Sequence, residues 1–439
     1  MTVGTQRPAL PTAPAHVAPS GTAASVGAQW AAAIAVLLVA ARTTVLGGRV
    51  EPGLVVAAAL LPVWWRHARR WAGWAWVATI VPLAVVSGLW LTEYASQSGP
   101  TSSKLEIANT ALGLELVLGT GVVLWCREVL GSPRTAVIFG VGLLLAGNGA
   151  AFRDGTWRFG FETPVTVIVL ALAWWSGSRA VQIVTILALA ALSATSGARS
   201  TSAILVLALV LTIVQWLPRA STARGSRLRV AGFAILLVAA LYNVGLTLIL
   251  DGYLGDSAQE RTQLQIDQSG SVLLGARPEM GATAALFVHH PVGFGSGTLP
   301  TSSIVMVAKS GMAQLGYNPD NGYVEHYMFG NAIVLHSNVG DFWALFGIPG
   351  IVLAGTILVL VLSGYVRYLA NRHAVALLTY MTVRTVWNVF FSPSYTSVPF
   401  AVLALGLLMW PRRAALSSTD HTSPVPGPGW WTARREQIH

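Results

Sequence analysis

Charged residues are scarce in this chain. Asp, Glu, Lys and Arg together make up 10% of its 439 residues, whereas hydrophobic residues make up 54%. Average soluble domains carry about 25% charged residues, so this chain lacks the polar side chains with which a protein of its size covers itself in water. The shortage argues against a soluble globular protein.

Cysteine and lysine are almost absent. Cys126 is the only cysteine, which excludes an internal disulfide and a metal site built from several cysteines. Its apolar surroundings favour a packing role. Lys104 and Lys309 are the only lysines, so the formal charge of +10 comes almost wholly from arginine. The arginines lie singly or in pairs at the ends of apolar segments, which favours membrane topology over nucleic-acid binding.

Long apolar blocks are what the sequence has instead. They show neither the amphipathic spacing of soluble helices nor the alternation of barrel strands, so they predict helices that face lipid. We predict an all-α polytopic membrane protein with about twelve transmembrane helices, several of them shorter than the ~20 residues that a bilayer needs. The predicted spans are 28–47, 50–65, 71–92, 107–126, 135–150, 163–175, 180–195, 202–217, 229–250, 348–368, 374–391 and 397–410.

The two ends of the chain differ in composition from the apolar blocks. Residues 1–27 are rich in Ala, Pro, Thr and Ser and lack the charged start and short apolar core of a cleaved signal, so we predict a disordered tail. Residues 411–439 form a second predicted tail. Between them lie nine spans in 28–250, one long loop at 251–347 and three spans in 348–410.

The distribution of arginine predicts the side of each loop. Twelve basic residues fall in loops after even-numbered spans: Arg66, Arg69, Arg70, Arg127, Arg134, Arg179, Arg219, Arg224, Arg227, Arg229, Arg367 and Arg372. Five fall in the short loops after odd-numbered spans: Arg49, Lys104, Arg153, Arg158 and Arg199. The positive-inside rule then predicts a multi-pass protein of the cell membrane with both termini cytoplasmic and the long loop extracytoplasmic.

The first candidate site is the turn between the seventh and eighth predicted spans. There Arg199 lies among small hydroxyl residues, between Ser193 and Thr201. One interpretation is an interfacial arginine that anchors the helix end. The other is an anion clamp, because guanidinium binds phosphate oxygens bidentately and nearby hydroxyls can add hydrogen bonds. The residues alone leave both interpretations open.

The second candidate lies in the long loop. Arg277 precedes a stretch that runs from His289 and His290 to three alternate glycines, Gly293, Gly295 and Gly297. The glycines predict a tight backbone turn beside a ligand. No strand–turn–helix pattern surrounds them, which argues against a dinucleotide site. Adjacent histidines usually point apart, so we expect no metal here.

The third candidate opens the helix that re-enters the membrane. His336 lies at its start, with Asp341 five residues later, about a turn and a half along a helix. A lone histidine at an interface is commonly structural. A histidine with a pKa near neutrality is also the natural base for taking a proton from a sugar hydroxyl. Arg199 would lower its pKa and Asp341 would raise it, so the sequence leaves the direction open.

Together these stretches resemble the O-antigen ligase and Wzy-type polymerase superfamily, whose members move glycans off a polyprenyl diphosphate carrier. In that family the long outer loop ends in a His followed by Gly eleven and fourteen positions later, as in His336, Gly347 and Gly350. Upstream the family has an Arg and a His-Pro-hydrophobe-x-Gly-x-Gly stretch, similar to Arg277 and residues 290–295. Twelve spans with a long loop between the ninth and tenth are also similar.

The resemblance implies an activity and residue roles. It implies inverting, metal-independent glycosyl transfer without a cofactor, from a polyprenyl-diphosphate-linked glycan to the hydroxyl of a glycan, lipid or protein acceptor at the outer face of the membrane. Arg199 and Arg277 would bind the diphosphate, and His336 would take the hydroxyl proton. Family members often carry Asn directly after the His and Glu nine residues after it, where this chain has Ser337 and Leu345. The partner of His336 therefore stays open.

Five further residues are candidates for substrate binding. Arg158 lies on a predicted outer loop, and Arg384 lies inside a predicted span, where a charge is costly and commonly functional. The others are His290, Asn338 and Asp341. The alternative function is a transporter or flippase for an anionic or lipid-linked substrate, for which twelve spans are equally natural. That alternative predicts charges spread through two related halves, and we find no internal repeat.

Overall fold

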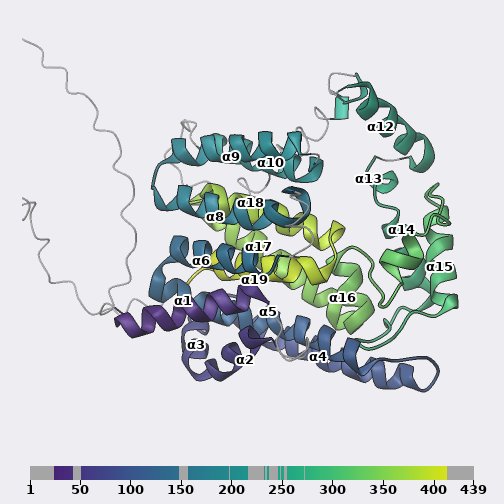
Figure 1. Cartoon of the computed structure of the whole chain (residues 1–439), viewed down its shortest axis with the longest axis horizontal. Coiled ribbons are helices and arrows are strands. Elements are labelled where there is room, and N and C mark those ends of the chain that lie inside the picture. The colour runs from purple at the N-terminus through teal and green to yellow at the C-terminus, as the bar shows by residue number, and fades with distance from the viewer. Residues whose placement is uncertain are drawn as a thin grey trace, which may run out of the picture.

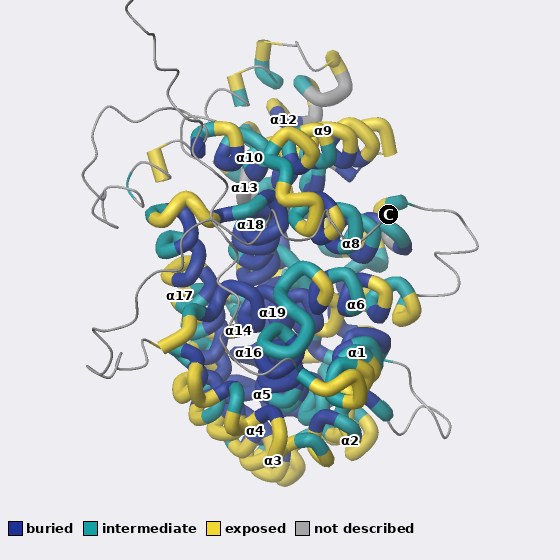
Figure 2. Tube along the Cα trace, turned by 90° about the vertical axis from the view of Figure 1, so that its left-hand side faces the viewer, coloured by how far each residue is buried: buried dark blue, intermediate teal, exposed yellow. Residues whose placement is uncertain are grey.

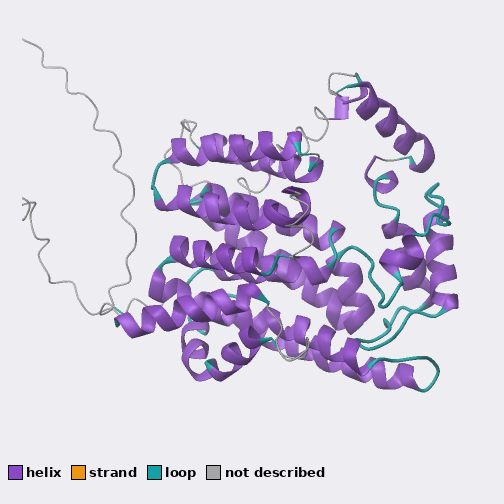
Figure 3. Ribbon diagram, viewed as in Figure 1, coloured by secondary structure: helices purple, strands orange, loops and turns teal. Residues whose placement is uncertain are grey.

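In the computed structural model, the structure describes residues 24–42, 51–147, 157–196, 198–215, 255–270 and 272–412, with a few more between 232 and 251. Within these ranges the chain is helical and contains no β-strand (Figure 3). Both predicted tails lie almost wholly outside the described residues. The prediction of an all-α protein is confirmed for the described part of the chain.

Figure 1 shows the order of the described helices along the chain. Those before residue 216 are α1 (Val26–Ala41), α2 (Pro52–Ala59), α3 (Leu61–Ala68), α4 (Trp74–Ser96), α5 (Ser103–Leu130), α6 (Ser132–Leu145), η1 (Trp157–Phe161), α8 (Glu162–Trp175), α9 (Arg179–Thr195) and α10 (Arg199–Val214). Those after residue 255 are α12 (Asp256–Ser269), α13 (Val272–Gly275), α14 (Glu279–His289), α15 (Ser302–Ala313), η2 (Val324–Met328), α16 (Asn338–Phe346), α17 (Ile348–Ala370), α18 (Ala376–Phe391) and α19 (Ser394–Leu408).

A helix or a pair of helices occupies each predicted span except 229–250, most of which lies outside the described residues. In the part of the chain that the structure describes, three helices, α4, α5 and α17, are long and apolar enough to cross a membrane. The other apolar helices are shorter than the ~20 residues that a bilayer requires. Local signals set several helix starts: the side chain of Ser102 accepts the backbone N–H of Leu105 at 3.4 Å, and Ser178 does the same for Val181 at 3.3 Å.

The segment predicted as a long loop contains helices of its own. Within 251–347 the chain forms α12, α13, α14, α15, η2 and α16, and α14 packs against α15 around a separate apolar core that includes Leu286, Met312 and Met328. In Figure 1, α12, α13, α14 and α15 stand to one side of the stacked apolar helices, whereas α16 packs among them against α17 and α4. The sequence did not show this, because the helices are short and their apolar faces are interrupted by polar residues.

The apolar helices surround α19. Thirteen of its fifteen residues are buried, as expected of a helix that is apolar all round. It packs against α5, which is also largely buried. In contrast, α4 exposes Leu83, Val86, Trp90 and Tyr94 along one face, and Figure 2 shows exposed residues on the outer sides of α4 and α17. A wide exposed apolar surface is unfavourable in water, so this surface is suited to lipid.

One end of the helix stack is organised by Arg127, and we call it the Arg127 end. The Arg127 guanidinium donates to the carbonyls of Gly406 and Met409 at 3.0 and 2.9 Å, which are free acceptors at the end of α19. It also lies 4.2 Å from the ring centroid of Trp71. Backbone pairing of Arg70 with Arg412 at 2.7 Å closes this end.

The opposite end, which we call the His336 end, is held by close backbone contacts. The N–H groups of Phe294 and Gly295 donate to the carbonyl of Ala344 in α16 at 2.8 and 3.0 Å. A Cβ on Gly293 would lie 2.5 Å from the Trp343 carbonyl oxygen, and Gly293 has φ +90°. A Cβ on Gly350 would lie 1.9 Å from the carbonyl oxygen of Phe342. The N–H of Gly293 also donates to the carbonyl of His290 at 3.0 Å, so the glycine stretch forms a turn that packs closely against α16.

Candidate functional site

The start of α14 brings a cation and a carboxylate together. Pro278 is the N-cap of this helix and Glu279 its first residue, so Arg277 lies just outside it. The Arg277 guanidinium faces two rings of α18, at 5.3 Å from the centroid of Trp387 and 5.8 Å from that of Phe391. Arg277 forms no ion pair with any carboxylate in the described residues. Its charge is stabilised by aromatic faces, which leaves the N–H groups of the guanidinium for an anion.

Glu279 is buried, with only 8% of its surface exposed. Its Oε1 accepts a hydrogen bond from the Tyr323 hydroxyl at 2.7 Å. Its Oε2 is buried and has no partner among the described residues. Burial, followed by the negative charge of Glu279, raises the pKa of Tyr323, so the phenol stays protonated and donates. Glu279 thus has one fixed oxygen and one free oxygen.

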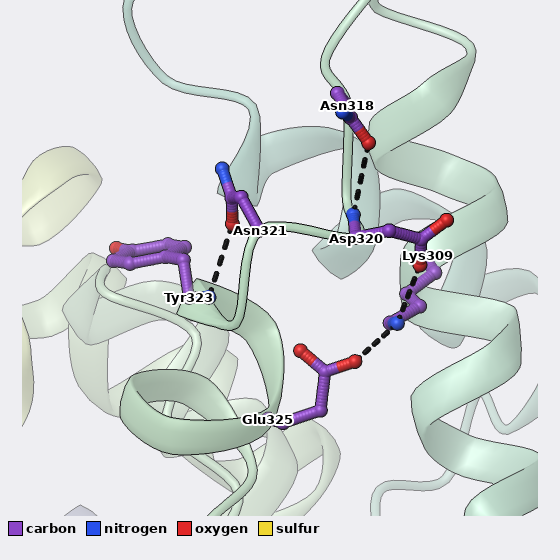
Figure 4. Close-up of polar contacts among 6 residues, drawn as sticks. All are labelled: Lys309, Asn318, Asp320, Asn321, Tyr323 and Glu325. Atoms are coloured by element: carbon purple, nitrogen blue, oxygen red, sulfur yellow. Dashed lines mark hydrogen bonds and ion pairs between the residues drawn. The ribbon is translucent and has the colours of Figure 1, made fainter.

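The loop that carries Tyr323 is tied down by polar contacts (Figure 4). The Asn321 side chain accepts the backbone N–H of Tyr323 at 3.0 Å. Lys309 of α15 donates to Asp320 at 2.7 Å and also pairs with Glu325 of η2. The two partners of Lys309 lie before and after Tyr323 in the chain, so α15 helps to position the tyrosine together with the turn around it.

His336 packs against the ring of Tyr323. The two ring centroids are 5.8 Å apart, and Nδ1 of His336 is buried without a hydrogen-bond partner among the described residues. The backbone of His336 has φ +55°, a left-handed conformation that is costly for a residue with a Cβ. Burial lowers the pKa of His336; Arg277 also lowers it, while Glu279 and the Val334 carbonyl raise it. Histidine is therefore neutral near pH 7 and can accept a proton.

An apolar cavity of about 250 Å³ begins beside these residues. Met280 and Phe287 of α14 line one side, and Trp343 of α16 lines the other. Ile351 of α17 and Phe390 of α18 complete the lining toward the apolar helices. The cavity thus extends from the neighbours of Glu279 and His336 into the apolar part of the protein.

A second cluster surrounds Arg384 of α18. Its guanidinium donates to Glu162 Oε1 at 3.0 Å and to the Thr201 hydroxyl at 2.9 Å. Thr201 is the third residue of α10, which begins at Arg199; the Arg199 side chain lies outside the described part. Arg158 lies in η1, the short helix that ends immediately before Glu162. The predicted residues Arg158, Arg199 and Arg384 therefore lie on adjoining elements.

Helix α18 connects the two clusters. Arg384 precedes Trp387 by three residues, which is a rise of about 4.5 Å along the helix. Phe391, the second ring beside Arg277, lies about two turns from Arg384. Arg277 thus lies near the C-terminal end of α18, and Arg384 lies near its middle, beside Glu162 of α8 and Thr201 of α10.

Asn338 and Asp341 are engaged within the protein. Asn338 Oδ1 accepts from the Ser397 hydroxyl at 2.5 Å. Asp341 accepts the backbone N–H of Leu335 at 2.6 Å and that of Ser394 at 2.7 Å. Both residues therefore tie α16 to the start of α19, and Asp341 also fixes the turn that holds His336. Both carboxylate oxygens of Asp341, and Oδ1 of Asn338, are thus used within the protein.

His290 lies away from the cluster. It is the exposed C-cap of α14, and its ring packs 5.1 Å from that of Phe294. The eleven residues of α14 separate it from Glu279 by about 16 Å along the helix axis. In the described residues, no group of three His, Cys, Asp or Glu side chains could hold a metal ion.

Two important residues were missed by the sequence analysis. Glu279 stands two residues after Arg277, so a carboxylate beside a candidate cation was visible but was given no role. Tyr323 had no signal, because the contact with His336 and Glu279 depends on how the loop folds back. No protein-family model, curated protein or solved structure matches this chain.

Proposed function

We propose that this protein is a membrane glycosyltransferase of the O-antigen ligase and polymerase type. It transfers or polymerises glycan from a polyprenyl diphosphate carrier onto an acceptor hydroxyl at the outer face of the cytoplasmic membrane. The observation that carries the proposal is the arrangement at the His336 end: an arginine without a carboxylate partner, a neutral, partly buried histidine and an apolar cavity. In a lipid-linked sugar diphosphate, the diphosphate matches the arginine and the isoprenoid chain matches the apolar cavity, while the histidine can activate the acceptor hydroxyl.

The reaction follows from these groups. His336 takes the proton of the acceptor hydroxyl, and the oxygen forms a bond to the anomeric carbon of the donor sugar. The bond from that carbon to the diphosphate breaks, and the electron pair leaves on the diphosphate. Arg277, together with Arg199, stabilises the charge that develops there. The first isoprene units of the carrier occupy the cavity beside Phe287 and Trp343.

The sidedness of the basic residues supports an outer location for the site. The arginines of the even-numbered loops that the structure describes belong to the Arg127 end: Arg66, Arg69, Arg70, Arg127, Arg134, Arg179, Arg367 and Arg372. The positive-inside rule assigns that end to the cytoplasm. The twelve spans and both cytoplasmic termini are part of this proposal.

Analysis of lipid-linked glycans in cells tests the function. Deletion of the gene should cause accumulation of a polyprenyl-diphosphate glycan on the outer face of the membrane, detected by mass spectrometry. Accumulation on the inner face would instead favour the flippase alternative. An unchanged lipid-linked pool, with wild-type envelope glycans, would contradict both.

Thiol labelling tests the orientation separately. Cysteine at the exposed position Ser302 in α15 should react with an impermeant reagent added to intact cells, whereas cysteine at the exposed Asn371 should react only after lysis. The native Cys126 is buried, so the parent protein serves as the blank. Labelling in the opposite pattern would invert the proposed topology and remove the outer-face site.

A further inference from the structure

Two buried polar atoms at the His336 end lack hydrogen-bond partners among the described residues: Oε2 of Glu279 and Nδ1 of His336. A buried polar group without a partner costs about 1–3 kcal/mol. Such atoms call for a partner that the resting site does not supply. The proposed reaction uses His336 but gives Glu279 no role.

Tyr323 brings the two residues into one site. Its hydroxyl donates to Oε1 of Glu279 at 2.7 Å, and its ring lies 5.8 Å from that of His336. The hydroxyl bond restricts rotation of the carboxylate, so Oε2 has a defined direction. Because the carboxylate is buried, its charge acts on neighbours with little screening by water.

The other charged groups near His336 cannot take the same role. Arg277 is a cation. Asp341, the partner considered from sequence, uses both oxygens on the backbone of Leu335 and Ser394. Glu325 is on η2, but it pairs with Lys309 at the protein surface. Of the carboxylates in these elements, Glu279 alone is buried with a free oxygen.

We propose that Glu279 is the positioning carboxylate of His336, and that its buried charge stabilises the imidazolium that His336 becomes when it removes a proton from the acceptor. This inference rests on the proposed function. In the resting site the two residues make no direct bond, and both contact Tyr323. Once the hydroxyl proton has moved to the ring nitrogen that faces the acceptor, the imidazolium and the buried carboxylate attract each other.

The pairing assists the reaction because it strengthens as the proton moves. An interaction that is stronger in the transition state than in the ground state raises the rate of the chemical step. Glu279 thereby acts as the third group that orients a base in nucleophilic sites. Its charge also raises the pKa of His336 against the opposing effect of burial. Tyr323 prevents the carboxylate from turning away.

The reactivity of His336 toward diethyl pyrocarbonate tests this pairing without the reaction. The reagent modifies neutral imidazole, so the rate of modification of the His336 peptide, followed by mass spectrometry against pH, reports the pKa in the purified full-length protein. Glu279→Gln retains the acceptor for Tyr323 but removes the charge. The midpoint should fall by about one pH unit. Glu279→Asp, which keeps the charge, should hold the midpoint near that of the parent.

Glu325→Gln is the matched control, since it removes an exposed carboxylate from the same loop, and it should leave the midpoint unchanged. Turnover of lipid-linked donor by Glu279→Gln should fall about tenfold, equivalent to one pKa unit. A midpoint in Glu279→Gln equal to that in Glu325→Gln, or an equal shift in Glu279→Asp and Glu279→Gln, would overturn the pairing. If the midpoint moves as expected while the parent protein transfers no sugar, the pairing stands and the proposed function fails.

Discussion

The two arginine–glutamate pairs around α18 differ in how they use their charges. Arg384 donates directly to Glu162 at 3.0 Å and to Thr201 at 2.9 Å, so its charge is neutralised within the protein. Arg277 and Glu279 are separated by one residue but do not pair with each other. Arg277 rests on Trp387 and Phe391, and Glu279 bonds to Tyr323.

This difference separates a structural pair from a candidate site. In the closed pair, Nη1 of Arg384 makes both bonds, and loss of the arginine would leave Glu162 as an uncompensated buried charge. The pair at Arg277 is open, because aromatic rings stabilise the cation without using its hydrogen-bond donors. We therefore predict that substitutions at Arg384 lower the stability of the folded protein, whereas substitutions around Arg277 lower the rate of the reaction.

The largest expected effect is at His336. His336→Ala should lower the turnover of lipid-linked donor by about 10²–10⁴-fold, the range that general-base catalysis supplies. Donor binding and thermal stability should stay close to those of the parent, because the arginines remain. Turnover near the parent rate would make His336 a structural residue of the left-handed turn.

The closed pair should show the next largest effect. Arg384→Leu leaves Glu162, only 4% exposed, without its partner, and should destabilise the protein by about 3–5 kcal/mol. Thermal unfolding in detergent and yield in the membrane measure this. Arg277→Leu is the comparison and should remain within about 1 kcal/mol of the parent, since only cation–π contacts are lost. Equal destabilisation by both variants would contradict the distinction between the Arg384 pair and the Arg277 pair.

Arg277→Lys tests whether the open cation acts by geometry as well as charge. Lysine keeps the charge but loses the planar fork that binds diphosphate bidentately and stacks on rings. We expect about a tenfold loss of turnover, equivalent to the ~1.4 kcal/mol that one good hydrogen bond to a charged group supplies. Protein yield should be normal. Full activity would show that Arg277 only anchors the loop on α18.

The smallest effect is on the pH profile. Burial lowers the pKa of His336, and the neutral ring is the active base, so activity should rise with pH with its midpoint below the ordinary His value of about 6.5. Turnover of the parent protein between pH 4.5 and 8 provides the measurement. A midpoint above 6.5 would mean that the carboxylate of Glu279 outweighs burial in the loaded site.

The helices of the bundle could be predicted from sequence because apolar blocks and their boundaries are local features. The predicted spans 107–126 and 348–368 correspond to α5 and α17, whose ends lie within four residues of the prediction. The helices inside 251–347 could not be predicted in this way, because their short apolar faces become buried only when α14 packs against α15.

The candidate site was predictable only in part. Arg277 and His336 were identified by residue type and spacing, and the fold brings both to Tyr323. Asp341 was considered as the partner of His336 because it is near in sequence, yet its carboxylate serves backbone N–H groups. Glu279 lies 57 positions from His336 in the chain. Residues so far apart in the chain leave no periodic signal in one sequence.

The central claim is that the protein performs chemistry on a lipid-linked glycan. The most direct measurement uses purified protein in lipid vesicles, supplied with lipid-linked glycan extracted from cells that lack the gene, and follows the donor by mass spectrometry. We predict release of free polyprenyl diphosphate with transfer of the glycan to an acceptor chain, and loss of both products in His336→Ala. Movement of intact donor across the bilayer, with no diphosphate released, would contradict the account.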